Sequence, residues 1–512
     1  MTMATWNNRL TMISRPTWLW LIPLTLTFAQ PVHAQLAPEW YHIHARPYKD
    51  FGKSVILTSD GGFAVTGFAA SDSGSGGELL LLRTDSQGNL EWSRTYGSSD
   101  FDKGKEILQT ADGGYIIAGY SIFHESNPLA RQALVMKTDA DGEEIWTQYF
   151  GSSGVDSAFD IVPVQGGGFF VAGDYELEGN DRNTYLILLD EDGSVIWEQV
   201  VGDELADERT FTGCQLSNGS FVYGGNVRHP LVADNPSDFH IGSVDIQGNL
   251  LWEREFGGEG VDIVRRMRAL PTGGFVLIGE TELLPSTPES HDDMYVAMFT
   301  EDGDSVWTSL IGTAGDEECY GLEITSDGGL ITAGSTLGPN TNSWDLYVAK
   351  VDTLGNTEYT WSYLSPGIEF GKGIVEQAPG EYVLTGKTTY QTDVAGSLLL
   401  IKLVETVNSY DQPNLRTHRQ EQVTSGYTLH PVFPNPTNAD AVVSLTLPKS
   451  GYINTAVYDL MGRQVAVLQD GVLTTGIHHI ALAGNNLASG VYFVRAVVPG
   501  EMDEVQRITI IR

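Results

Sequence analysis

Residues 104–150, GKEILQTADGGYIIAGYSIFHESNPLARQALVMKTDADGEEIWTQYF, contain the pattern that decides the fold. Short runs of apolar, β-branched and aromatic residues are separated by tight Asp-Gly turns and one polar loop. Alternating runs between such turns predict four antiparallel strands joined as a meander. Four strands per repeat are typical of one blade of a β-propeller, which is built from radially repeated four-stranded sheets.

The same unit recurs along most of the chain. Its first marker is a turn, an apolar strand and a glycine, and the copies end at Gly67, Gly119, Gly173, Gly224, Gly279, Gly334 and Gly386. Its second marker is an Asp-x-x-Gly turn followed by a strand with tryptophan, and the copies end at Trp92, Trp146, Trp197, Trp252 and, in degenerate form, Trp307 and Trp361. Because a single blade cannot bury both of its faces, the seven repeats are expected to close into a ring.

The seventh repeat lacks the strand with tryptophan, but a lone copy precedes the first repeat around Trp40. We predict that this copy pairs with Ser397–Glu405 as the outermost strand of the seventh blade, which removes an exposed sheet edge. The predicted fold class is therefore all-β. Residues 35–405 are expected to form a seven-bladed β-propeller with four-stranded blades, closed by the N-terminal strand.

The blade arrangement also assigns two faces to the predicted ring. The tight turns fall on one face, and the other face carries the blade-to-blade crossings and four loops of uneven length. These loops are residues 69–78, 121–130, 228–237 and 281–291. Loops of uneven length on a rigid scaffold are a frequent place for binding.

An acidic residue stands at a fixed distance before every marker glycine. The seven acids are Asp50, Asp102, Asp156, Asp207, Asp262, Glu317 and Glu369. Each is predicted to begin an innermost strand near the mouth of the central channel, where the acids together suit a ligand such as a calcium ion or a basic group. An acid at a strand start also accepts backbone N–H groups and fixes the crossing between blades. The sequence leaves both hypotheses open, and metal binding stays unknown.

Two Asp-x-Asp-Gly turns, Asp139–Gly142 and Asp190–Gly193, also raise the question of calcium. They lack the further oxygen ligands and the closing glutamate that a calcium loop needs, so hairpin turns are the favoured interpretation. His42 and His44 share one face of a strand, but no third metal ligand accompanies them. No organic cofactor is predicted.

The chain carries 66 acidic against 29 basic residues, which gives a net charge of −37. Such a charge argues against nucleic acid as a partner, because phosphate binding needs a basic face. The two cysteines, Cys214 and Cys319, fall in non-adjacent repeats and are predicted to be separate core residues.

The sequence contains no arrangement of nucleophile and base, no metal-binding histidine cluster and no glycine-rich phosphate loop. We therefore expect a monomeric, non-enzymatic binding module, with a glycan or a surface protein as its partner. Two alternatives stay open. One is a secreted glycan hydrolase or lyase that uses channel-facing carboxylates such as Asp102 and Asp156, and the other is a structural component of the cell surface.

Residues 1–34 have the features of a secretory signal peptide. Arg9 and Arg15 supply positive charge, and residues 18–28, WLWLIPLTLTF, form a short apolar run. Val32-His33-Ala34 then gives a cleavage site of small-residue type before Gln35. The run is too short to span a membrane comfortably, so no transmembrane span is expected.

After Glu405 the repeat pattern stops. Residues 406–426, TVNSYDQPNLRTHRQEQVTSG, are polar and without periodicity, which is typical of a linker. Residues 427–512 then contain about seven short apolar runs, which predict a small Ig-like β-sandwich.

This C-terminal segment resembles the type A sorting domain of the bacterial type IX secretion system. The resemblance rests on four ordered motifs, whose main residues are Pro434, Asn435, Pro436, Tyr458, Asp459, Gly462, Arg463, Gly490, Val491 and Tyr492. Phe433 stands where the family usually has tyrosine. The resemblance implies export by the general secretory route through the periplasm, then crossing of the outer membrane by the type IX machinery. It also implies that the protein is released or attached to the outer surface, commonly after removal of the domain.

Overall fold

The computed structural model describes residues 34–510 with interruptions. The segments left out are 1–33, 45–48, 71–75, 98–100, 123–130, 177–181, 203–205, 230–235, 284–290, 314, 338–342, 364–366, 390–395, 408–426, 430–431, 433–440, 460–462, 474–475, 483–486 and 511–512. Residues 1–33 of the predicted signal peptide, most of the linker, and half or more of each predicted variable loop lie outside the described residues. In the described part of the chain, no helix is long and apolar enough to cross a membrane.

The stretch quoted first forms one four-stranded antiparallel sheet. Its strands are β6 (Phe101–Gln109), β7 (Tyr115–Ile122), β8 (Arg131–Thr138) and β9 (Glu144–Phe150). The two middle strands are buried over most of their length, whereas the outermost strand, β9, is largely exposed. Both faces of the sheet are covered in its middle, as the continuous apolar runs of these strands require.

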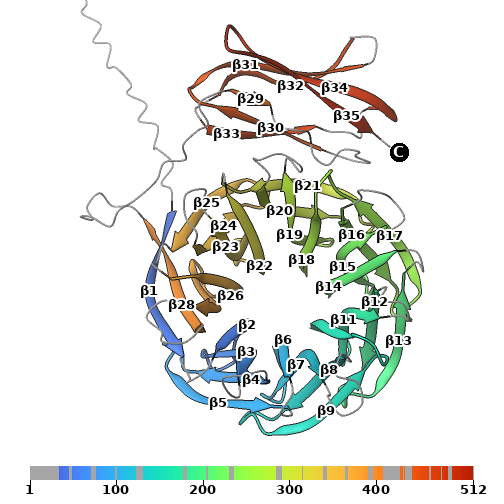
Figure 1. Ribbon diagram of the computed structural model, residues 1–512, viewed down its shortest axis with the longest axis vertical. Coiled ribbons are helices and arrows are strands. Elements are labelled where there is room, and N and C mark those ends of the chain that lie inside the picture. The colour runs from blue at the N-terminus through green and yellow to red at the C-terminus, as the bar shows by residue number, and fades with distance from the viewer. Residues whose placement is uncertain are drawn as a thin grey trace, which may run out of the picture.

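Five further groups of four strands repeat this order, and Figure 1 shows all of them arranged around a common axis. The first of them precedes β6, and one parallel bridge between Gly77 and Phe101 joins these two sheets. The strands are β2 (Asp50–Leu57), β3 (Phe63–Ala70), β4 (Gly77–Thr84) and β5 (Leu90–Tyr96); β10 (Ser157–Pro163), β11 (Phe169–Glu176), β12 (Arg182–Leu189) and β13 (Val195–Val201); β14 (Asp207–Gln215), β15 (Phe221–Arg228), β16 (Asp238–Val244) and β17 (Leu250–Phe256); β18 (Asp262–Ala269), β19 (Phe275–Leu283), β20 (His291–Phe299) and β21 (Ser305–Ile311); β22 (Asp316–Ile324), β23 (Leu330–Leu337), β24 (Trp344–Val351) and β25 (Thr357–Tyr363).

One more sheet combines the start of the described chain with its later part. Its order is β1-β28-β27-β26, with β1 (Ala34–His44) outermost and β28 (Ser397–Val407), β27 (Glu381–Thr388) and β26 (Glu369–Ala378) following inward. β1 runs antiparallel to β28, with Trp40 opposite Lys402 and His44 opposite Leu398. In Figure 1 the blue β1 accordingly lies beside the orange β28.

The tryptophan of one sheet packs on the Asp-x-x-Gly turn of the next. A Cβ atom added to Gly142 would lie 2.8 Å from Trp92, and one added to Gly88 would lie 2.6 Å from Trp40. Both glycines have a positive φ, 78° and 76°, which only glycine adopts without strain. Trp40 therefore occupies on the first sheet the position that Trp92 occupies on the second.

The Asp-x-x-Gly turns are hairpins stabilised from within. The Asp139 carboxylate accepts the N–H groups of Asp141 at 3.0 Å and Glu143 at 2.8 Å. The turns that begin at Asp190 and Asp245 are built in the same way. These aspartates serve their own turns, as the hairpin interpretation of the sequence predicts.

Apolar side chains fill the space between neighbouring sheets. The contact between the first two sheets, for example, buries Leu81, Ile107 and Tyr115 in one cluster. Cys214 and Cys319 are buried in two different clusters and form no disulfide, as the sequence predicts.

The C-terminal residues form a separate pair of sheets. One sheet contains β29 (Thr428–Leu429), β30 (Ala441–Leu447) and β33 (Gly476–Leu482), and the other has the order β32 (Gln464–Leu473), β31 (Gly451–Asp459), β34 (Gly490–Val498) and β35 (Met502–Ile510). Both sheets contribute to a single apolar core that includes Val443, Leu445, Val457 and Val494. This is the two-layer arrangement of a small β-sandwich (Figure 1).

Candidate ligand site at the central axis

The predicted acids lie at or next to the start of the innermost strands, and most are buried. Asp102, Asp156, Asp262, Glu317 and Glu369 have no exposed surface, and Asp50 is 2% exposed. Asp207 is half-buried and accepts the backbone N–H of Arg182 at 3.2 Å. The buried carboxylates therefore point into the protein rather than toward solvent.

Several of these acids bind the chain segment that crosses from the preceding sheet. The Asp156 carboxylate accepts the N–H of Ser152 at 2.5 Å and that of Glu176 at 2.8 Å. The Glu317 carboxylate accepts the N–H of Thr313 at 2.6 Å in the same way. Ser152 and Thr313 each lie four residues before the acid that they bind, in the crossing segment. Each acid therefore fixes the place where the chain enters its innermost strand.

Burial changes the acidity of these groups. It raises the pKa of the Asp262 carboxyl to about 8, although the Thr281 hydroxyl and the Gly258 N–H favour the charged form. Burial also raises the pKa of Asp156 and Glu317. Within the described ranges, no three His, Cys, Asp or Glu side chains are placed to hold one metal ion.

The strand register changes the assignment in the fourth repeat. Thr210 lies opposite Gly225, just as Gly52 lies opposite Gly67 and Gly104 opposite Gly119. The marker glycine of this repeat is therefore Gly225, and the residue that corresponds to the other acids is Glu208 rather than Asp207. The two adjacent glycines, 224 and 225, conceal this shift of one residue in the sequence.

The innermost strands share a feature that the sequence analysis did not identify. Every one of them has a β-bulge at the same place, where one residue has no partner on the second strand. We call these residues the axial ring: Lys53, Lys105, Phe159, Phe211, Arg265, Tyr320 and Lys372. All seven are partly exposed, so solvent reaches each of them.

The residues beside each bulge point to the neighbouring sheets. A Cβ atom on Gly104, before one bulge, would meet Thr66 of the preceding sheet at 2.0 Å. A Cβ atom on Gly373, after another bulge, would meet the backbone of Val55 in the following sheet at 3.0 Å. The neighbouring sheets occupy the space on both faces of the innermost strand. The extra side chain of the bulge is therefore directed at the axis.

Side-chain contacts join the consecutive members of the axial ring from Lys105 to Lys372. Four of these contacts are cation–aromatic pairs and one is an aromatic pair, each within the usual range for such pairs. The distances are 4.6 Å from Lys105 Nζ to the Phe159 ring, 5.2 Å between the Phe159 and Phe211 rings, 5.7 and 5.3 Å from the Arg265 guanidinium to the Phe211 and Tyr320 rings, and 3.0 Å from Lys372 Nζ to the Tyr320 ring.

Positive charge at the axial ring is poorly compensated. In the described part of the chain, only Arg265 of the four ring cations forms an ion pair, with Glu280 at 2.6 Å. Further cations gather around Phe51, where the ammonium groups of Lys49, Lys53 and Lys103 lie 5.7, 5.0 and 4.6 Å from the ring centroid. An anion is the missing partner that such a cluster favours.

Burial and neighbouring positive charges lower the pKa values of the lysines in and beside the axial ring. Burial, followed by the nearby charge of Arg265, lowers the pKa of Lys53 to about 8. Burial and the charge of Lys53 lower the pKa of Lys103 to about 7. Burial also holds the pKa values of Lys105 and Lys372 well below the ordinary value.

A buried ion pair crosses the axis one residue further along the strands. The Arg266 guanidinium lies 2.5 Å from the Glu106 carboxylate and 3.5 Å from that of Asp160. Arg266 lies on β18, Glu106 on β6 and Asp160 on β10. The sheets that contain β18 and β6 are not neighbours. Side chains therefore occupy the axis at this level, and the axial ring is approached from the side of the strand starts.

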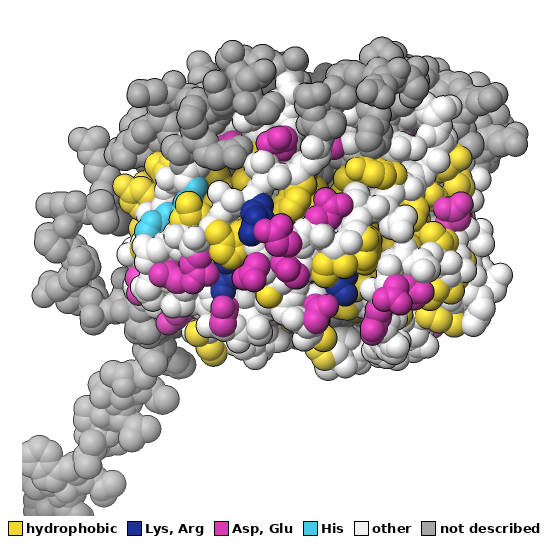
Figure 2. All heavy atoms as spheres, turned by 90° about the horizontal axis from the view of Figure 1, so that it is seen from below, with side chains coloured by type: hydrophobic (Ala, Val, Ile, Leu, Met, Phe, Trp, Pro, Cys, Tyr) yellow, Lys and Arg dark blue, Asp and Glu magenta, His cyan; other side chains and the backbone are white. Residues whose placement is uncertain are grey.

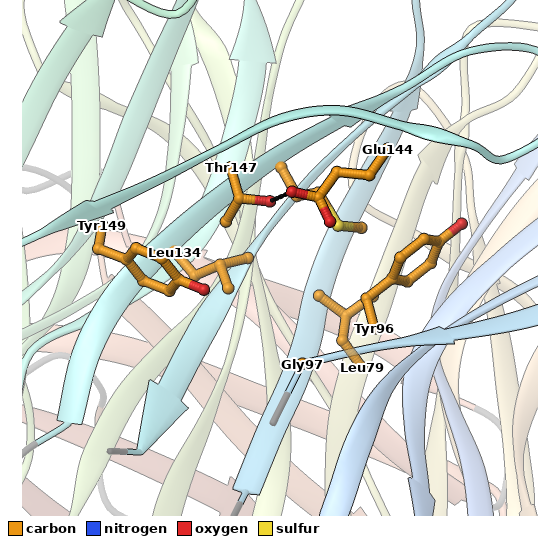
Figure 3. Close-up of a pocket in the computed structure, with 8 residues that line it drawn as sticks. Leu79, Tyr96, Gly97, Leu134, Glu144, Thr147 and Tyr149 are labelled. Atoms are coloured by element: carbon orange, nitrogen blue, oxygen red, sulfur yellow. Dashed lines mark hydrogen bonds between the residues drawn. The ribbon is translucent and has the colours of Figure 1, made fainter. Parts of the chain in front are cut away.

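The outer surface has a different character. Figure 2 shows one edge of the molecule, with many acidic side chains among apolar ones and few basic ones. Figure 3 shows a groove between the outer parts of the first two sheets, lined by Leu79, Tyr96, Leu134, Glu144 and Tyr149 among others. Glu144 is the one charged side chain there, and it accepts the Thr147 hydroxyl at 2.7 Å. The groove thus lacks the converging polar groups that a specific site needs.

In the C-terminal domain, the described motif residues build local structure. The Asp459 carboxylate accepts the backbone N–H of Arg463 at 2.9 Å and pairs with its guanidinium at 2.7 Å, which closes the turn after β31. Gly490, Val491 and Tyr492 begin β34, opposite the end of β35. Pro434, Asn435, Pro436 and Gly462 lie outside the described residues.

The family comparison identifies this domain. Residues 431–510 match the family described as the secretion system C-terminal sorting domain. These residues are a type IX secretion sorting domain. The chain is therefore a secreted or cell-surface protein that interacts with the type IX machinery. No curated protein sequence matches the chain.

Several solved structures are similar to this chain in the arrangement of their strands. One is PorZ of Porphyromonas gingivalis, described as an essential bacterial surface component of the type IX secretion system, with 14% identity over 88% of this chain and 69% of PorZ and a TM-score of 0.33. Another is the Pan2 WD40 domain of Neurospora crassa, with 10% identity over 74% of this chain and 97% of the domain and a TM-score of 0.47. A third is a protein of unknown function from Dyadobacter fermentans, with 12% identity over 72% of this chain and 99% of that protein and a TM-score of 0.42. Likeness at this level carries nothing about ligand or activity.

Proposed function

We propose that the chain is an exported binding protein, in which a closed seven-bladed β-propeller presents a ligand site at its central axis. The sorting domain delivers the propeller to the cell surface or the medium. A signal peptide at residues 1–34 starts this route through the periplasm, and residues 406–426 link the two folded parts.

Ring closure by β1 is supported by two independent contacts. β1 pairs with β28 along its length, and Trp40 lies on the turn glycine Gly88 as Trp92 lies on Gly142. Closure in this way leaves the last blade with four strands, like the others, and removes a sheet edge that would invite aggregation.

The axial ring is the observation that carries the binding function. It joins four cations and three aromatic side chains in equivalent places of consecutive sheets, and all are open to solvent. We assign the acids to a different role. Asp156 and Glu317 bind crossing segments, so the acids stabilise the ring and do not form a rim site for calcium.

The second candidate function is a glycan hydrolase or lyase based on Asp102 and Asp156. Burial raises the pKa of Asp156, which is a property of general acids. However, both oxygens of its carboxylate accept hydrogen bonds from the backbone, and the side chain has no exposed surface where a substrate could reach it. We therefore expect ligand binding without turnover.

The test uses the full chain and a panel of bacterial and plant polysaccharides. Binding is measured by co-sedimentation, and cleavage by new reducing ends or unsaturated products. The proposal expects binding without product, and equal results for the wild type and Asp102→Asn. Product formation that this variant abolishes would establish the enzyme instead.

Delivery is tested in a bacterium that has the type IX system. Removal of residues 431–510 is expected to keep the protein inside the cell envelope, whereas the complete chain reaches the surface or the medium. Protease treatment of intact cells distinguishes the two locations. Equal export of both forms would contradict the assigned role of the domain.

A further inference from the structure

The axial ring has a charge opposite to that of the molecule. The whole chain carries a net charge of −37, yet Lys53, Lys105, Arg265 and Lys372 meet at one level around the axis. Among the described residues, only Arg265 of these four cations pairs with an acid, Glu280, and positive groups that lie close together repel one another. A site with this composition is completed by a ligand that brings negative charge.

Three aromatic side chains complete the ring. Phe159, Phe211 and Tyr320 are partly exposed, and each touches a neighbouring member of the ring. Exposed aromatic rings at a binding site favour ligands with apolar surface, such as the C–H face of a pyranose. A ligand that suits the whole ring therefore has both acidic groups and apolar faces within one short unit.

We infer that the axial ring binds an acidic saccharide, with its carboxylate or sulfate groups on the ring lysines and its sugar face on the aromatic side chains. The inference rests on the proposed binding function and names its ligand. Uronic acids and sulfated sugars share this chemistry. An acidic peptide matches the charges but lacks an apolar sugar face next to each charge, so it fits the ring less completely.

The ion pair below the ring limits how the saccharide enters. Glu106, Asp160 and Arg266 fill the axis directly beyond the bulges. A polymer cannot pass through this level, so the site takes a chain end or a short segment from the side of the strand starts. Oligosaccharides of a few units should accordingly bind nearly as well as the polymer.

The acidic outer surface makes this binding selective. Most of the molecule repels a polyanion, and the edge shown in Figure 2 presents mainly acidic charged groups. Binding of a polyanion to this protein is therefore not the general attraction that a basic protein shows. It requires the local field of the axial ring.

Binding should depend on pH, because the ring lysines must be protonated to hold an anion. With pKa values of about 8 for Lys53 of the ring and about 7 for Lys103 beside it, the ammonium forms are lost as the pH rises through this range. The affinity is expected to fall from pH 6 to pH 9, with proton uptake on binding near pH 8. The charged groups that face these lysines are Lys49, Arg131, Asp174, Glu280, Glu318 and Arg265.

The experiment measures binding of the full chain to oligogalacturonate and to dextran sulfate by calorimetry at pH 6.5, with neutral dextran and polyglutamate as comparison ligands. Lys53→Met and Lys105→Met keep the apolar stem of each side chain and remove its charge. We expect each to weaken binding about tenfold, as loss of a charge-assisted contact does. Phe159→Leu tests the aromatic contribution and is expected to weaken saccharide binding in the same direction.

Lys137→Met is the matched control, because Lys137 lies on β8 away from the ring and pairs with Asp112. It is expected to leave binding unchanged. Tryptophan fluorescence checks that every variant folds. Preference for oligogalacturonate or for dextran sulfate decides between carboxylate and sulfate, because each carries only one of the two groups.

The possible outcomes separate the two levels of the proposal. Binding of neutral dextran alone, or acidic saccharide binding that survives both lysine substitutions, overturns the acidic-saccharide inference and leaves the binding function intact. Equal binding of polyglutamate shows that charge alone is recognised and also overturns it. Absence of any ligand across the wider polysaccharide panel counts against the binding function itself.

Discussion

Replacing Arg266 by methionine should destabilise the propeller more than any surface substitution. The guanidinium holds Glu106 at 2.5 Å and Asp160 at 3.5 Å, and these two carboxylates are only 4% and 1% exposed. Methionine fills a similar volume but removes the nearest cation of both acids, and the more exposed Arg268 stays near Glu106, at 3.7 Å. The contact also joins β18 to β6, in sheets that are not neighbours.

The size of the effect follows from this burial. Removal of one partner from a buried ion pair costs about 3–5 kcal/mol, because an uncompensated charge stays in the interior. Asp160 keeps bonds from the Thr212 hydroxyl and the Gly213 N–H, so most of the loss falls on Glu106. Combining Glu106→Gln with Arg266→Met should therefore restore more than half of the lost stability.

Urea unfolding followed by tryptophan fluorescence measures this effect. Eight of the 11 tryptophans lie between Trp40 and Trp361, the other three lie in the predicted signal peptide, and none lies in the sorting domain, so the signal of the exported chain reports the propeller. The change in midpoint multiplied by the slope gives the change in the free energy of unfolding. Arg268→Met is the control. Arg268 lies two residues further on the same strand, is 29% exposed and is 3.7 Å from Glu106, so its loss should cost less than about 1 kcal/mol.

The pH dependence gives a second check with a definite sign. Burial raises the pKa of Glu106, and removal of Arg266 raises it further. A group whose folded pKa lies above its unfolded value contributes stability at low pH that is lost as the pH rises. The deficit of Arg266→Met should hence grow between pH 5 and pH 8. A cost below about 1 kcal/mol at pH 8, or no recovery in the double variant, would refute the reasoning.

Other substitutions test the remaining features. Gly193→Val should lower the free energy of unfolding by about 2–4 kcal/mol, because φ is +82° and the new Cβ would lie 2.7 Å from Trp146. Asp156→Ala should cost about 2–4 kcal/mol by orphaning two backbone N–H groups, and it should leave saccharide affinity unchanged in the same calorimetric assay. Cys214 and Cys319 are 4% and 0% exposed and should resist thiol reagents in the folded protein but react fully in urea; fast labelling of the folded protein would contradict their burial.

Much of the fold was predictable because the repeats carry local signals. The Asp-Gly turns, the apolar runs of β7 and β8 and the placement of Trp40 each depend on chemistry within a few residues. Pairing of β1 with β28 followed from counting strands per repeat, which needs no knowledge of distant contacts. The C-terminal domain was recognisable from its motifs alone.

The axial ring was not predictable in the same way. A β-bulge adds one residue and shifts the alternation of side chains, so a strict period of two assigns the wrong direction to the residues around it. Lysine, arginine, phenylalanine and tyrosine at equivalent positions also form no common motif. The one regularity in the sequence is that each bulge residue lies at a fixed distance after the acid of its repeat. This regularity holds in the fourth repeat only when Glu208, rather than Asp207, is taken as the acid.

The position of β1 has a consequence for the order in which the protein matures. The ribosome makes β1 first among the strands of the propeller and its partner β28 last. The last sheet therefore cannot be completed until almost the whole propeller exists, and the pairing is as distant in sequence as the propeller allows, which slows folding. A circularly permuted chain that starts at β2 and carries residues 34–44 after β28 would build the same sheet from adjacent segments. The late completion of the last sheet is thus a property of the strand connectivity. It leaves the ring of sheets unclosed during synthesis of the propeller.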